Sequence, residues 1–237
     1  MTDCIILAGG LGTRLRGLTG DVIKPMVPVN GVPFLAYIVR QAQLMGFQRF
    51  IFAVGHRAEQ IESYFGTGEK WGISIIYSPE GDHLLGTGGG VKKGFGYVET
   101  EFALVMNGDS LCLADFKELI DVHERKHTPV TILGAHVENV ARFGSMKVDS
   151  EGMLLNFVEK TGTGTSGLIN AGVYVIRKSD IVSFKSPEAF SLEHDYFEVL
   201  PHGSIAVYES HAPFIDIGIP EDLVRLPSFL KQALGEL

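Results

Sequence analysis

Short apolar runs alternate with helix-forming segments through the first half of the chain, and no other sequence feature restricts the fold as much. The runs occupy residues 4–7, 50–54, 73–77 and 102–106. Runs of this kind are typical of strands that are buried on both faces, and strands that alternate with helices form parallel sheets. The alternation therefore predicts an α/β fold that is doubly wound and mainly parallel.

The segments between these runs carry apolar residues at helical spacing. They occupy residues 34–45, 58–65 and 115–126. Gly46 and Gly66 directly follow the first two segments, where a helix C-terminus favours glycine, and Pro129 stops the third. We expect these helices to cover the sheet.

The pattern changes after Pro129. Strand-like runs with few helices between them occupy residues 130–135, 144–148, 154–159 and 172–176. They predict a smaller mixed sheet set against the core. The threonine- and glycine-rich residues 161–167 are expected to form a loop, and a helix is expected from Pro220 onward.

Composition indicates one globular unit, since 45% of the 237 residues are hydrophobic and 20% are charged. We expect a single domain over residues 1–237. Its first half ends at about residue 129, its second part spans about 130–219, and a C-terminal helix covers about 220–237.

Charge and targeting signals restrict the partners. A formal net charge of −8 argues against binding to nucleic acid, because such proteins concentrate Lys and Arg. Cys4 and Cys112 stand inside apolar runs and are expected to be free and buried. The N-terminus lacks the positive charge of a signal peptide, and no stretch approaches the roughly 18 to 20 apolar residues of a membrane span. We therefore expect a cytoplasmic protein without a nucleic-acid or membrane partner.

A glycine-rich loop directly follows the first predicted strand. Gly9, Gly10 and Gly12 let the backbone approach a ligand closely and turn its N–H groups toward phosphate oxygens. Arg14 and Lys24 add positive charge. A tight structural turn with solvent-facing charges explains the same residues equally well, so the loop alone leaves both interpretations open.

Spacing excludes two better-known glycine loops. The dinucleotide fingerprint G-x-G-x-x-G requires glycine where Leu15 stands, and the P-loop pattern G-x-x-x-x-G-K-[ST] does not occur. Neither NAD nor a P-loop NTPase fits this sequence.

What this stretch does resemble is the signature of the sugar nucleotidyltransferase family. LAGGLGTRL at residues 7–15 matches L-A-G-G-x-G-T-R-L, and KPMVPV at residues 24–29 matches K-P-M-x-P-V. Later motifs of the family follow in order: LGTGG at 85–89, NGD at 107–109, EK at 159–160, NAG at 170–172 and Asp216 in FIDIGIPED. The resemblance spans nearly the whole chain. It implies a Rossmann-like core with a smaller sugar-binding lobe, so that residues 1–129 form the nucleotide-binding half.

The resemblance also implies roles for individual residues. The nucleotide-binding residues would be Leu7, Ala8, Gly9, Gly10, Gly12, Thr13, Arg14, Leu85, Gly86, Thr87, Gly88 and Gly89. The sugar-phosphate-binding residues would be Asn107, Gly144, Glu159, Lys160, Asn170 and Gly172. Asp109 and Asp216 would hold Mg²⁺, and Lys24 and Arg14 would be the catalytic cations.

Less specific interpretations compete at several of these positions. Residues 86–89 are expected to form a flexible loop before a helix that starts near Val91, and such a loop needs no ligand. A lone Asp after a strand is usually a turn residue. Glu159 and Lys160 also fit an ordinary charge pair at a strand end.

The implied reaction joins a sugar 1-phosphate to a nucleoside triphosphate and releases pyrophosphate. GLINAGVYVI and FIDIGIPED resemble, within the family, the D-glycero-D-manno-heptose 1-phosphate guanylyltransferases, which implies GTP and that heptose 1-phosphate as substrates. Uridylyl-, thymidylyl- and mannose-1-phosphate guanylyltransferases remain alternatives, as does a catalytically silent regulator that binds sugar nucleotides. Family members also commonly self-associate, so a homodimer is expected.

One further motif points elsewhere. HERKH at residues 123–127 matches the zinc pattern H-E-x-x-H, but Pro129 ends the helix at once and no third ligand is evident. His123 continues the apolar stripe of Phe116 and Leu119, so we expect it to pack against the sheet.

Overall fold

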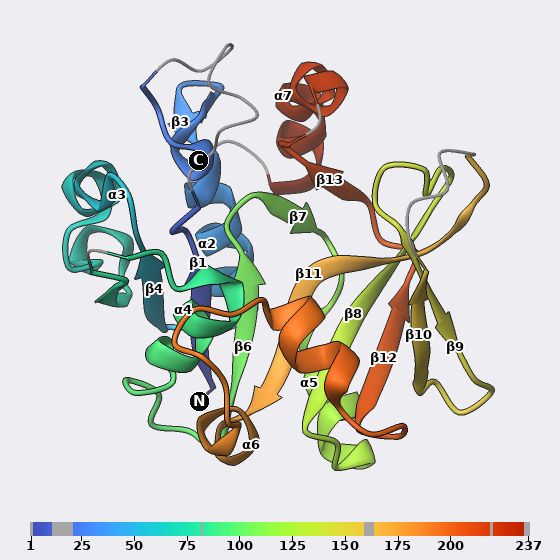
Figure 1. Ribbon diagram of the computed structural model, residues 1–237. Coiled ribbons are helices and arrows are strands. Elements are labelled where there is room, and N and C mark those ends of the chain that lie inside the picture. The colour runs from blue at the N-terminus through green and yellow to red at the C-terminus, as the bar shows by residue number, and fades with distance from the viewer. Residues whose placement is uncertain (1, 11–20, 82, 159–163, 219, 235–237) are drawn as a thin grey trace.

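The computed structural model describes residues 2–10, 21–81, 83–158, 164–218 and 220–234 (Figure 1). Within these residues a seven-stranded sheet runs through the molecule in the order β12-β8-β11-β6-β1-β4-β5. The strands are β1 Asp3–Leu7, β4 Arg49–Val54, β5 Ser74–Pro79, β6 Phe102–Asn107, β8 Val130–Val137, β11 Gly167–Arg177 and β12 Ile205–Ser210. Neighbours pair in parallel except β11, which is antiparallel to both β6 and β8. The mainly parallel α/β fold expected from the sequence is confirmed.

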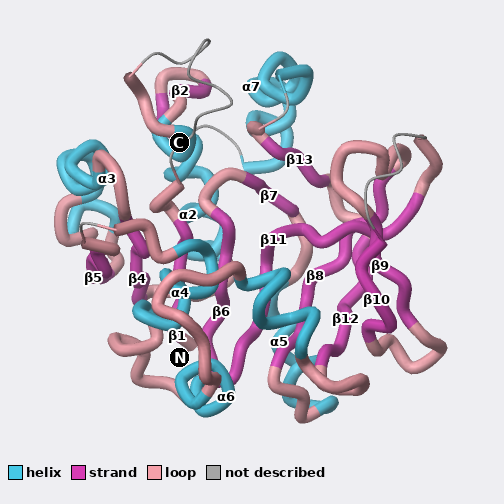
Figure 2. Tube along the Cα trace, in the orientation of Figure 1, coloured by secondary structure: helices cyan, strands magenta, loops and turns pink. Residues whose placement is uncertain are grey.

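Helices cover both faces of this sheet (Figure 2). The α-helices are α2 Phe34–Leu44, α3 Ala58–Phe65, α4 Gly86–Gly94, α5 Phe116–Lys126, α6 Lys178–Ser183 and α7 Pro220–Leu234. Shorter helical turns are η2 Lys24–Met26, η3 Glu69–Trp71, η4 Leu192–Tyr196, which is a π-helix, and η5 Phe197–Val199. One apolar cluster joins the sheet to α2, α3, α5 and α7, and a second joins it to α4, α6, η4 and η5.

Strand β1 shows how one strand serves both clusters. Cys4 and Ile6 belong to the first cluster and Ile5 to the second, and all three are fully buried. Successive side chains of a strand point to opposite faces, and each buried Ile contributes about 1.5–3 kcal/mol. An uninterrupted apolar run is therefore required here.

Small antiparallel pairs complete the fold. They are β7 Ser110–Cys112 with β13 Phe214–Asp216, β9 Ser145–Val148 with β10 Leu154–Val158, and β2 Pro28–Val29 with β3 Val32–Pro33. The β9–β10 pair projects beyond the main sheet (Figure 1). The second half of the chain also adds three strands to the main sheet, so its mixed character arises there, from antiparallel β11.

The prediction of a flexible loop at residues 86–89 is wrong, because α4 begins at Gly86 rather than near Val91. The glycines allow the helix to lie directly against residues 188–190. A Cβ on Gly89 would lie 2.8 Å from the Leu85 Cβ and would overlap the Glu188 carbonyl oxygen. The Gly88 amide donates to the Phe190 carbonyl at 2.9 Å. Tertiary packing thus outweighs the low helix propensity of glycine.

His123 packs against the sheet, as expected from its place on the apolar stripe. Its side chain is buried, its Nδ1 lies 2.9 Å from Thr131 Oγ1, and its ring centroid lies 5.2 Å from that of Phe102. Burial lowers the pKa of His123 to about 4. In the described part of the chain, no group of three or more His, Cys, Asp or Glu side chains is arranged to hold a metal ion.

No helix in the described ranges is long and apolar enough to cross a bilayer.

Candidate active site

The first part of the site is a cavity at the carboxyl ends of β1 and β6, which we call the strand-end cavity. Leu7 and Asn107 are register partners at these ends. The cavity has a volume of about 230 Å³ and is lined by Leu7, Gly9, Gly10, Glu80, Leu84, Gly86, Thr87, Asn107 and Asp109. Parallel α/β sheets commonly bind ligands at this edge.

Gly9 and Gly10 differ in how closely the protein packs against them. A Cβ on Gly9 would overlap the Glu80 carboxylate and lie 3.2 Å from the Gly55 amide nitrogen. No described atom lies within 4 Å of a Cβ on Gly10. Gly9 is therefore required by packing, whereas the described residues place no such restriction on Gly10.

Lys24, Asp109 and Asp216 form the charged centre of the site. Lys24 begins η2, Asp109 lies in the turn between β6 and β7, and Asp216 ends β13. The Lys24 ammonium lies 2.6 Å from Asp109 Oδ2 and 3.3 Å from Asp216 Oδ1. The β7–β13 pair sets this geometry, because it places Asp216 opposite Ser110, next to Asp109.

The surroundings of Asp216 make a nearby cation necessary. Burial raises the pKa of Asp216 and the Asp109 carboxylate raises it further, while the Lys24 ammonium lowers it. The Gly218 amide also donates to Asp216 Oδ1 at 2.6 Å. A Cβ on Gly218 would lie 2.5 Å from Lys24 Nζ, so glycine leaves the space that the ammonium occupies.

The donor atoms at this centre suit a hard cation. Two carboxylates, from Asp109 and Asp216, already share the Lys24 ammonium. Asn107, which lines the same cavity as Asp109, has a buried Oδ1 with no hydrogen-bond partner among the described residues. Oxygen donors of this kind match the preference of Mg²⁺.

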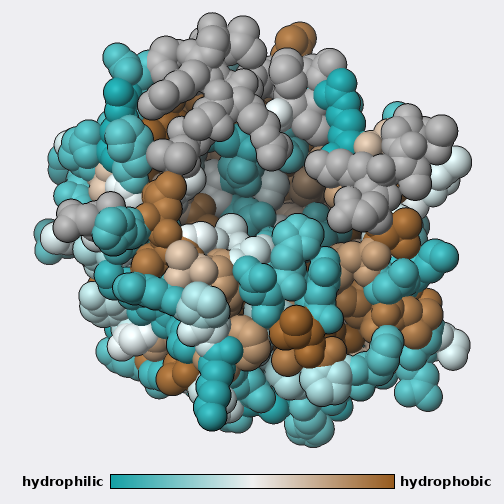
Figure 3. Space-filling view, in the orientation of Figure 1, coloured by the Kyte–Doolittle hydropathy of each residue, from teal (hydrophilic) through white to brown (hydrophobic). Residues whose placement is uncertain are grey.

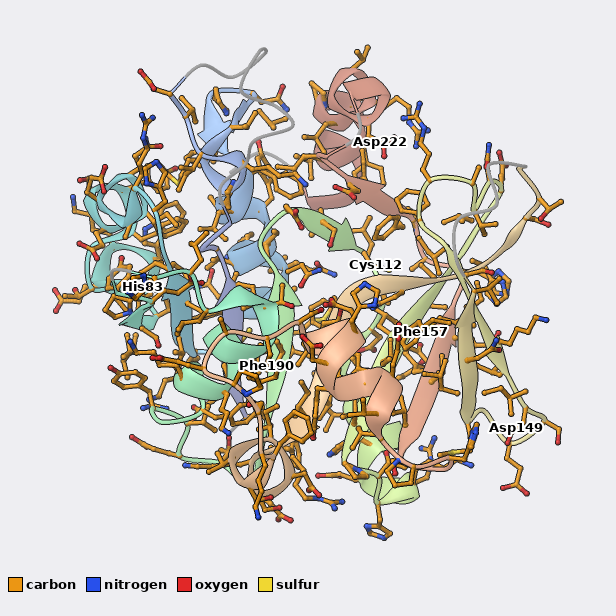
Figure 4. All side chains as sticks on the ribbon, in the orientation of Figure 1. His83, Cys112, Asp149, Phe157, Phe190 and Asp222 are labelled. Atoms are coloured by element: carbon orange, nitrogen blue, oxygen red, sulfur yellow. The ribbon has the colours of Figure 1, made fainter. Side chains whose placement is uncertain are left out.

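A second cavity, which we call the lobe cavity, lies between η4 and the β9–β10 pair. It has a volume of about 380 Å³ and is lined by Phe143, Gly144, Ser145, Met146, Phe157, Val158, Asn170, Glu193, His194 and Glu198. Phe157 belongs to β10 and is labelled in Figure 4 on the side of the pair that faces η4. Figure 3 shows this face of the molecule, with polar residues in and beside a recess near the centre.

A chain of hydrogen bonds connects the two cavities. Thr87, from the strand-end cavity, donates to Glu193 Oε2 at 3.1 Å, and the Tyr174 hydroxyl donates to Glu193 Oε1 at 3.1 Å. Asn170 Nδ2 in turn donates to the Tyr174 hydroxyl at 3.0 Å. Tyr174 is fully buried, and desolvation raises its pKa well above the usual value, so its hydroxyl keeps the proton that it donates.

Asn170 is held by a bulge in β11. The register of β11 against β8 shifts between Asn170 and Tyr174, and Gly172 has a φ of +72° that favours glycine. The Gly172 amide donates to Asn170 Oδ1 at 2.9 Å. A Cβ on Gly172 would lie 2.6 Å from Asn107 Nδ2, so this glycine also brings β11 close to β6.

The sequence-predicted residues have different outcomes. Those that line one of the two cavities or lie at the charged centre are Leu7, Gly9, Gly10, Lys24, Gly86, Thr87, Asn107, Asp109, Gly144, Asn170 and Asp216. Ala8, Leu85, Gly88, Gly89 and Gly172 are buried and line neither cavity. Gly12, Thr13, Arg14, Glu159 and Lys160 lie outside the described residues.

Sequence reasoning expected residues 78–84, which include Glu80, to line the base pocket, but it did not single out Glu193, His194 or Glu198. Glu80 accepts a hydrogen bond from the Leu85 amide at 3.1 Å, and burial raises its pKa. Nothing in the local sequence distinguishes Glu193, His194 and Glu198 from ordinary polar residues of the surface. Only the packing of η4 beside β11 brings them to the lobe cavity.

Comparison with known proteins gives a consistent result. The sequence matches the family described as nucleotidyl transferase over residues 3–232. It is 37% identical to D-glycero-alpha-D-manno-heptose 1-phosphate guanylyltransferase from Aneurinibacillus thermoaerophilus, covering 93% of this chain and 94% of that protein. It is 35% identical to mannose-1-phosphate guanylyltransferase from Mycobacterium tuberculosis, covering 94% of this chain but only 63% of that protein.

A solved structure shows the same architecture. HddC from Yersinia pseudotuberculosis, complexed with GMP-PN, superimposes with a TM-score of 0.88 at 34% sequence identity, covering 98% of this chain and 100% of that chain. A putative glucose-1-phosphate thymidylyltransferase from Bacillus anthracis superimposes with a TM-score of 0.81 at 20% identity, and this match concerns the fold alone.

Proposed function

The chain belongs to the nucleotidyl transferase family, and from this premise we propose that it transfers a guanylyl group from GTP to D-glycero-α-D-manno-heptose 1-phosphate. The products are the GDP-sugar and pyrophosphate. The observation that carries the proposal is the Lys24 ammonium between Asp109 and Asp216, where Asp109 also lines the strand-end cavity. The heptose relative of nearly equal length supports the choice of sugar.

The reaction requires no general base from the protein. The second pKa of a phosphate monoester is about 6, so the attacking phosphate of the sugar is largely dianionic at neutral pH. One of its oxygens forms a bond to the α-phosphorus of GTP. The bond from that phosphorus to the bridging oxygen breaks, and pyrophosphate leaves with the electron pair. The protein must hold two anions together and stabilise the charge that develops.

Lys24 is the cation that we propose at the reacting phosphates. Its side chain is 18% exposed and its ammonium lies between two carboxylates, so it can reach phosphate oxygens that enter the strand-end cavity. We further propose that Asp109 and Asp216 hold Mg²⁺, which neutralises phosphate charge when bound. The charged centre of Lys24, Asp109 and Asp216 would then carry a net positive charge, which suits a triphosphate.

Arg14 and the remaining loop residues complete the proposed nucleotide site. Arg14 would clamp the β- and γ-phosphates with its guanidinium, while Gly12 and Thr13 would direct backbone amides at the triphosphate. In the lobe cavity, Asn170 and Glu193 would bind sugar hydroxyls. Glu159 and Lys160, which lie outside the described residues, would bind the sugar and its phosphate.

Glu80 favours guanine as the base. Guanine presents two neighbouring donors, N1–H and N2–H, which one carboxylate can accept together, whereas uracil presents a single N3–H between two acceptors. Glu80 lines the strand-end cavity and keeps acceptor capacity beyond the Leu85 amide. Mannose 1-phosphate is the second candidate acceptor, because the mycobacterial relative carries that name.

A substrate panel tests the proposal. Purified protein with Mg²⁺ is incubated with each nucleoside triphosphate and a set of sugar 1-phosphates, and pyrophosphate release is measured. We expect pyrophosphate release with GTP and the heptose 1-phosphate. We also expect the Glu80→Gln variant to lose the preference for GTP over UTP. Absence of release with every pair would instead support a silent regulator.

A further inference from the structure

The lobe cavity has an inner and an outer end. Asn170 and Glu193 mark the inner end, because Glu193 is hydrogen-bonded to Thr87 of the strand-end cavity. Glu198 and Phe157 mark the outer end, because both also line a further hollow. This hollow shares no lining residue with the strand-end cavity, and its apolar lining includes Leu154, Phe197, Leu200 and Ile205. η4 and η5 run from one end to the other, so the polar side chains follow in the order Glu193, His194, Glu198.

The position of the reacting phosphates orients a sugar in this cavity. The 1-phosphate must reach the charged centre at Lys24 and Asp109, so carbon 1 lies toward the inner end. The exocyclic carbons of the sugar then extend toward the outer end. A D-glycero-D-manno-heptose differs from mannose there, since it carries an additional hydroxylated carbon and therefore a C6–C7 diol.

His194 and Glu198 form a hydrogen-bonded pair at the outer end. His194 Nδ1 lies 3.0 Å from Glu198 Oε1, four residues further along the chain. The two side chains are 67% and 45% exposed, so a ligand can reach them. His194 Nε2 and Glu198 Oε2 take no part in this hydrogen bond. They present a ligand with a ring nitrogen next to a carboxylate acceptor.

We propose that His194 and Glu198 read the C6–C7 diol and so select a heptose 1-phosphate over a hexose 1-phosphate. The inference rests on the proposed function, because it takes the lobe cavity as the sugar site. A neighbouring nitrogen and carboxylate match two vicinal hydroxyls, while a hexose with one exocyclic hydroxyl leaves one of these groups unpaired. Hydrogen bonds to charged groups are the contacts that give an enzyme strong discrimination between hydroxylated substrates.

The apolar wall of the cavity agrees with this assignment. Phe157 and Met146 belong to the β9–β10 pair and face the cavity opposite η4. An aromatic ring and a thioether pack against the carbon face of a sugar, and Ser145 is the polar residue that β9 adds to this wall. On the helical side, the polar residues toward the outer end are His194 and Glu198.

The test compares kcat/KM for the heptose 1-phosphate and for mannose 1-phosphate with GTP. We expect Glu198→Ala and His194→Ala each to lower kcat/KM for the heptose about tenfold and for mannose less than twofold, the size of one lost hydrogen bond to a charged group. The protein without substitutions should have a lower kcat/KM for a 7-deoxyheptose 1-phosphate than for the heptose 1-phosphate. Glu198→Ala should not change the kcat/KM for the 7-deoxy sugar.

His136 and Glu209 supply a matched control. They form another exposed His–Glu pair, with 2.8 Å between Nε2 and Oε2, and line neither cavity. His136→Ala and Glu209→Ala should leave both values unchanged. Equal losses for both sugars in the Glu198 and His194 variants, or no loss for either, would overturn the proposal. Failure of the unchanged protein to use any sugar 1-phosphate would refute the proposed function itself.

Discussion

At the residue scale, a few side chains from distant parts of the sequence meet within hydrogen-bond distance. Lys24 and Asp216 are 192 positions apart, yet their charged atoms lie 3.3 Å apart. The motifs predicted Lys24, Asp109 and Asp216 as separate residues with related roles. Only the structure shows that the ammonium lies between the two carboxylates.

Removal of the Lys24 charge should affect catalysis far more than folding. We expect Lys24→Met to lower kcat at least about 100-fold, because a preorganised charge at the reacting phosphates is lost. The midpoint of thermal unfolding at the assay's Mg²⁺ concentration should change little, since the site is only partly buried. Lys70→Met, at an exposed lysine of η3, is the control. An unchanged kcat in Lys24→Met would contradict the assignment.

At the element scale, the first turn of α4 shows how tertiary packing replaces local propensity. A run of glycines predicts a loop, but residues 188–190 lie directly on Gly86, Gly88 and Gly89 and hold them in a helix. Phe190, labelled in Figure 4, is the aromatic residue of this segment. These glycines allow the first turn of α4 to pack closely against residues 188–190, in addition to leaving room for a ligand.

Two neighbouring glycines of α4 should therefore respond differently to alanine. Gly89→Ala places a methyl group against the Glu188 carbonyl and the Leu85 Cβ and should lower the free energy of unfolding by about 1–3 kcal/mol. At Gly90 the nearest atoms would lie 3.5 Å from the new Cβ, so Gly90→Ala should be neutral or stabilising by up to about 1 kcal/mol. Urea denaturation measures both values, and equal effects would show that residues 188–190 do not hold α4.

His123 on α5 should make stability depend on pH. Its pKa is lowered from 6.5 to about 4, so the unfolded chain binds more protons than the native protein between these values. Stability is then fully present above pH 6.5 and falls by up to roughly 3 kcal/mol as the pH decreases to about 4. Denaturation at several pH values should show a shallower fall for His123→Gln. The exposed His202 offers a control in His202→Gln, and identical slopes for His123→Gln and the unchanged protein would contradict the prediction.

At the scale of the whole molecule, the two cavities are joined through protein rather than through a ligand. Thr87 accepts from the Leu192 amide at 2.8 Å while it donates to Glu193, so α4 and η4 are fastened at the boundary between the cavities. Glu193 continues the connection to Tyr174 and Asn170 in β11. A substitution in the strand-end cavity should therefore alter the binding of the sugar 1-phosphate in the lobe cavity.

Thr87→Val tests this connection. Valine keeps the shape of threonine but removes both hydrogen bonds, so the KM for the sugar 1-phosphate should rise several-fold, up to about tenfold. Thr87 lines the strand-end cavity and not the lobe cavity, so such a rise requires transmission through Glu193. Thr100→Val, which removes hydrogen bonds between Thr100, Asp3 and Phe102 far from both cavities, is the matched control. An unchanged KM for the sugar would refute the coupling.

Some expectations at this scale stay predictions. They are the division of the chain at about residue 129, the homodimer and the cytoplasmic location. Sedimentation velocity would check the homodimer.

The sequence by itself determined the fold class, because buried parallel strands require the continuous apolar runs that stand at residues 4–7, 50–54 and 102–106. Its motifs also named Lys24, Asp109 and Asp216. The tertiary structure alone decided that α4 starts at Gly86 and that Glu193, His194 and Glu198 line the lobe cavity. The physical reason is the distance along the chain over which each signal acts. The periodicity of apolar residues indicates which face of one helix or strand is buried, whereas the wall of a cavity is made by elements that are distant in the sequence.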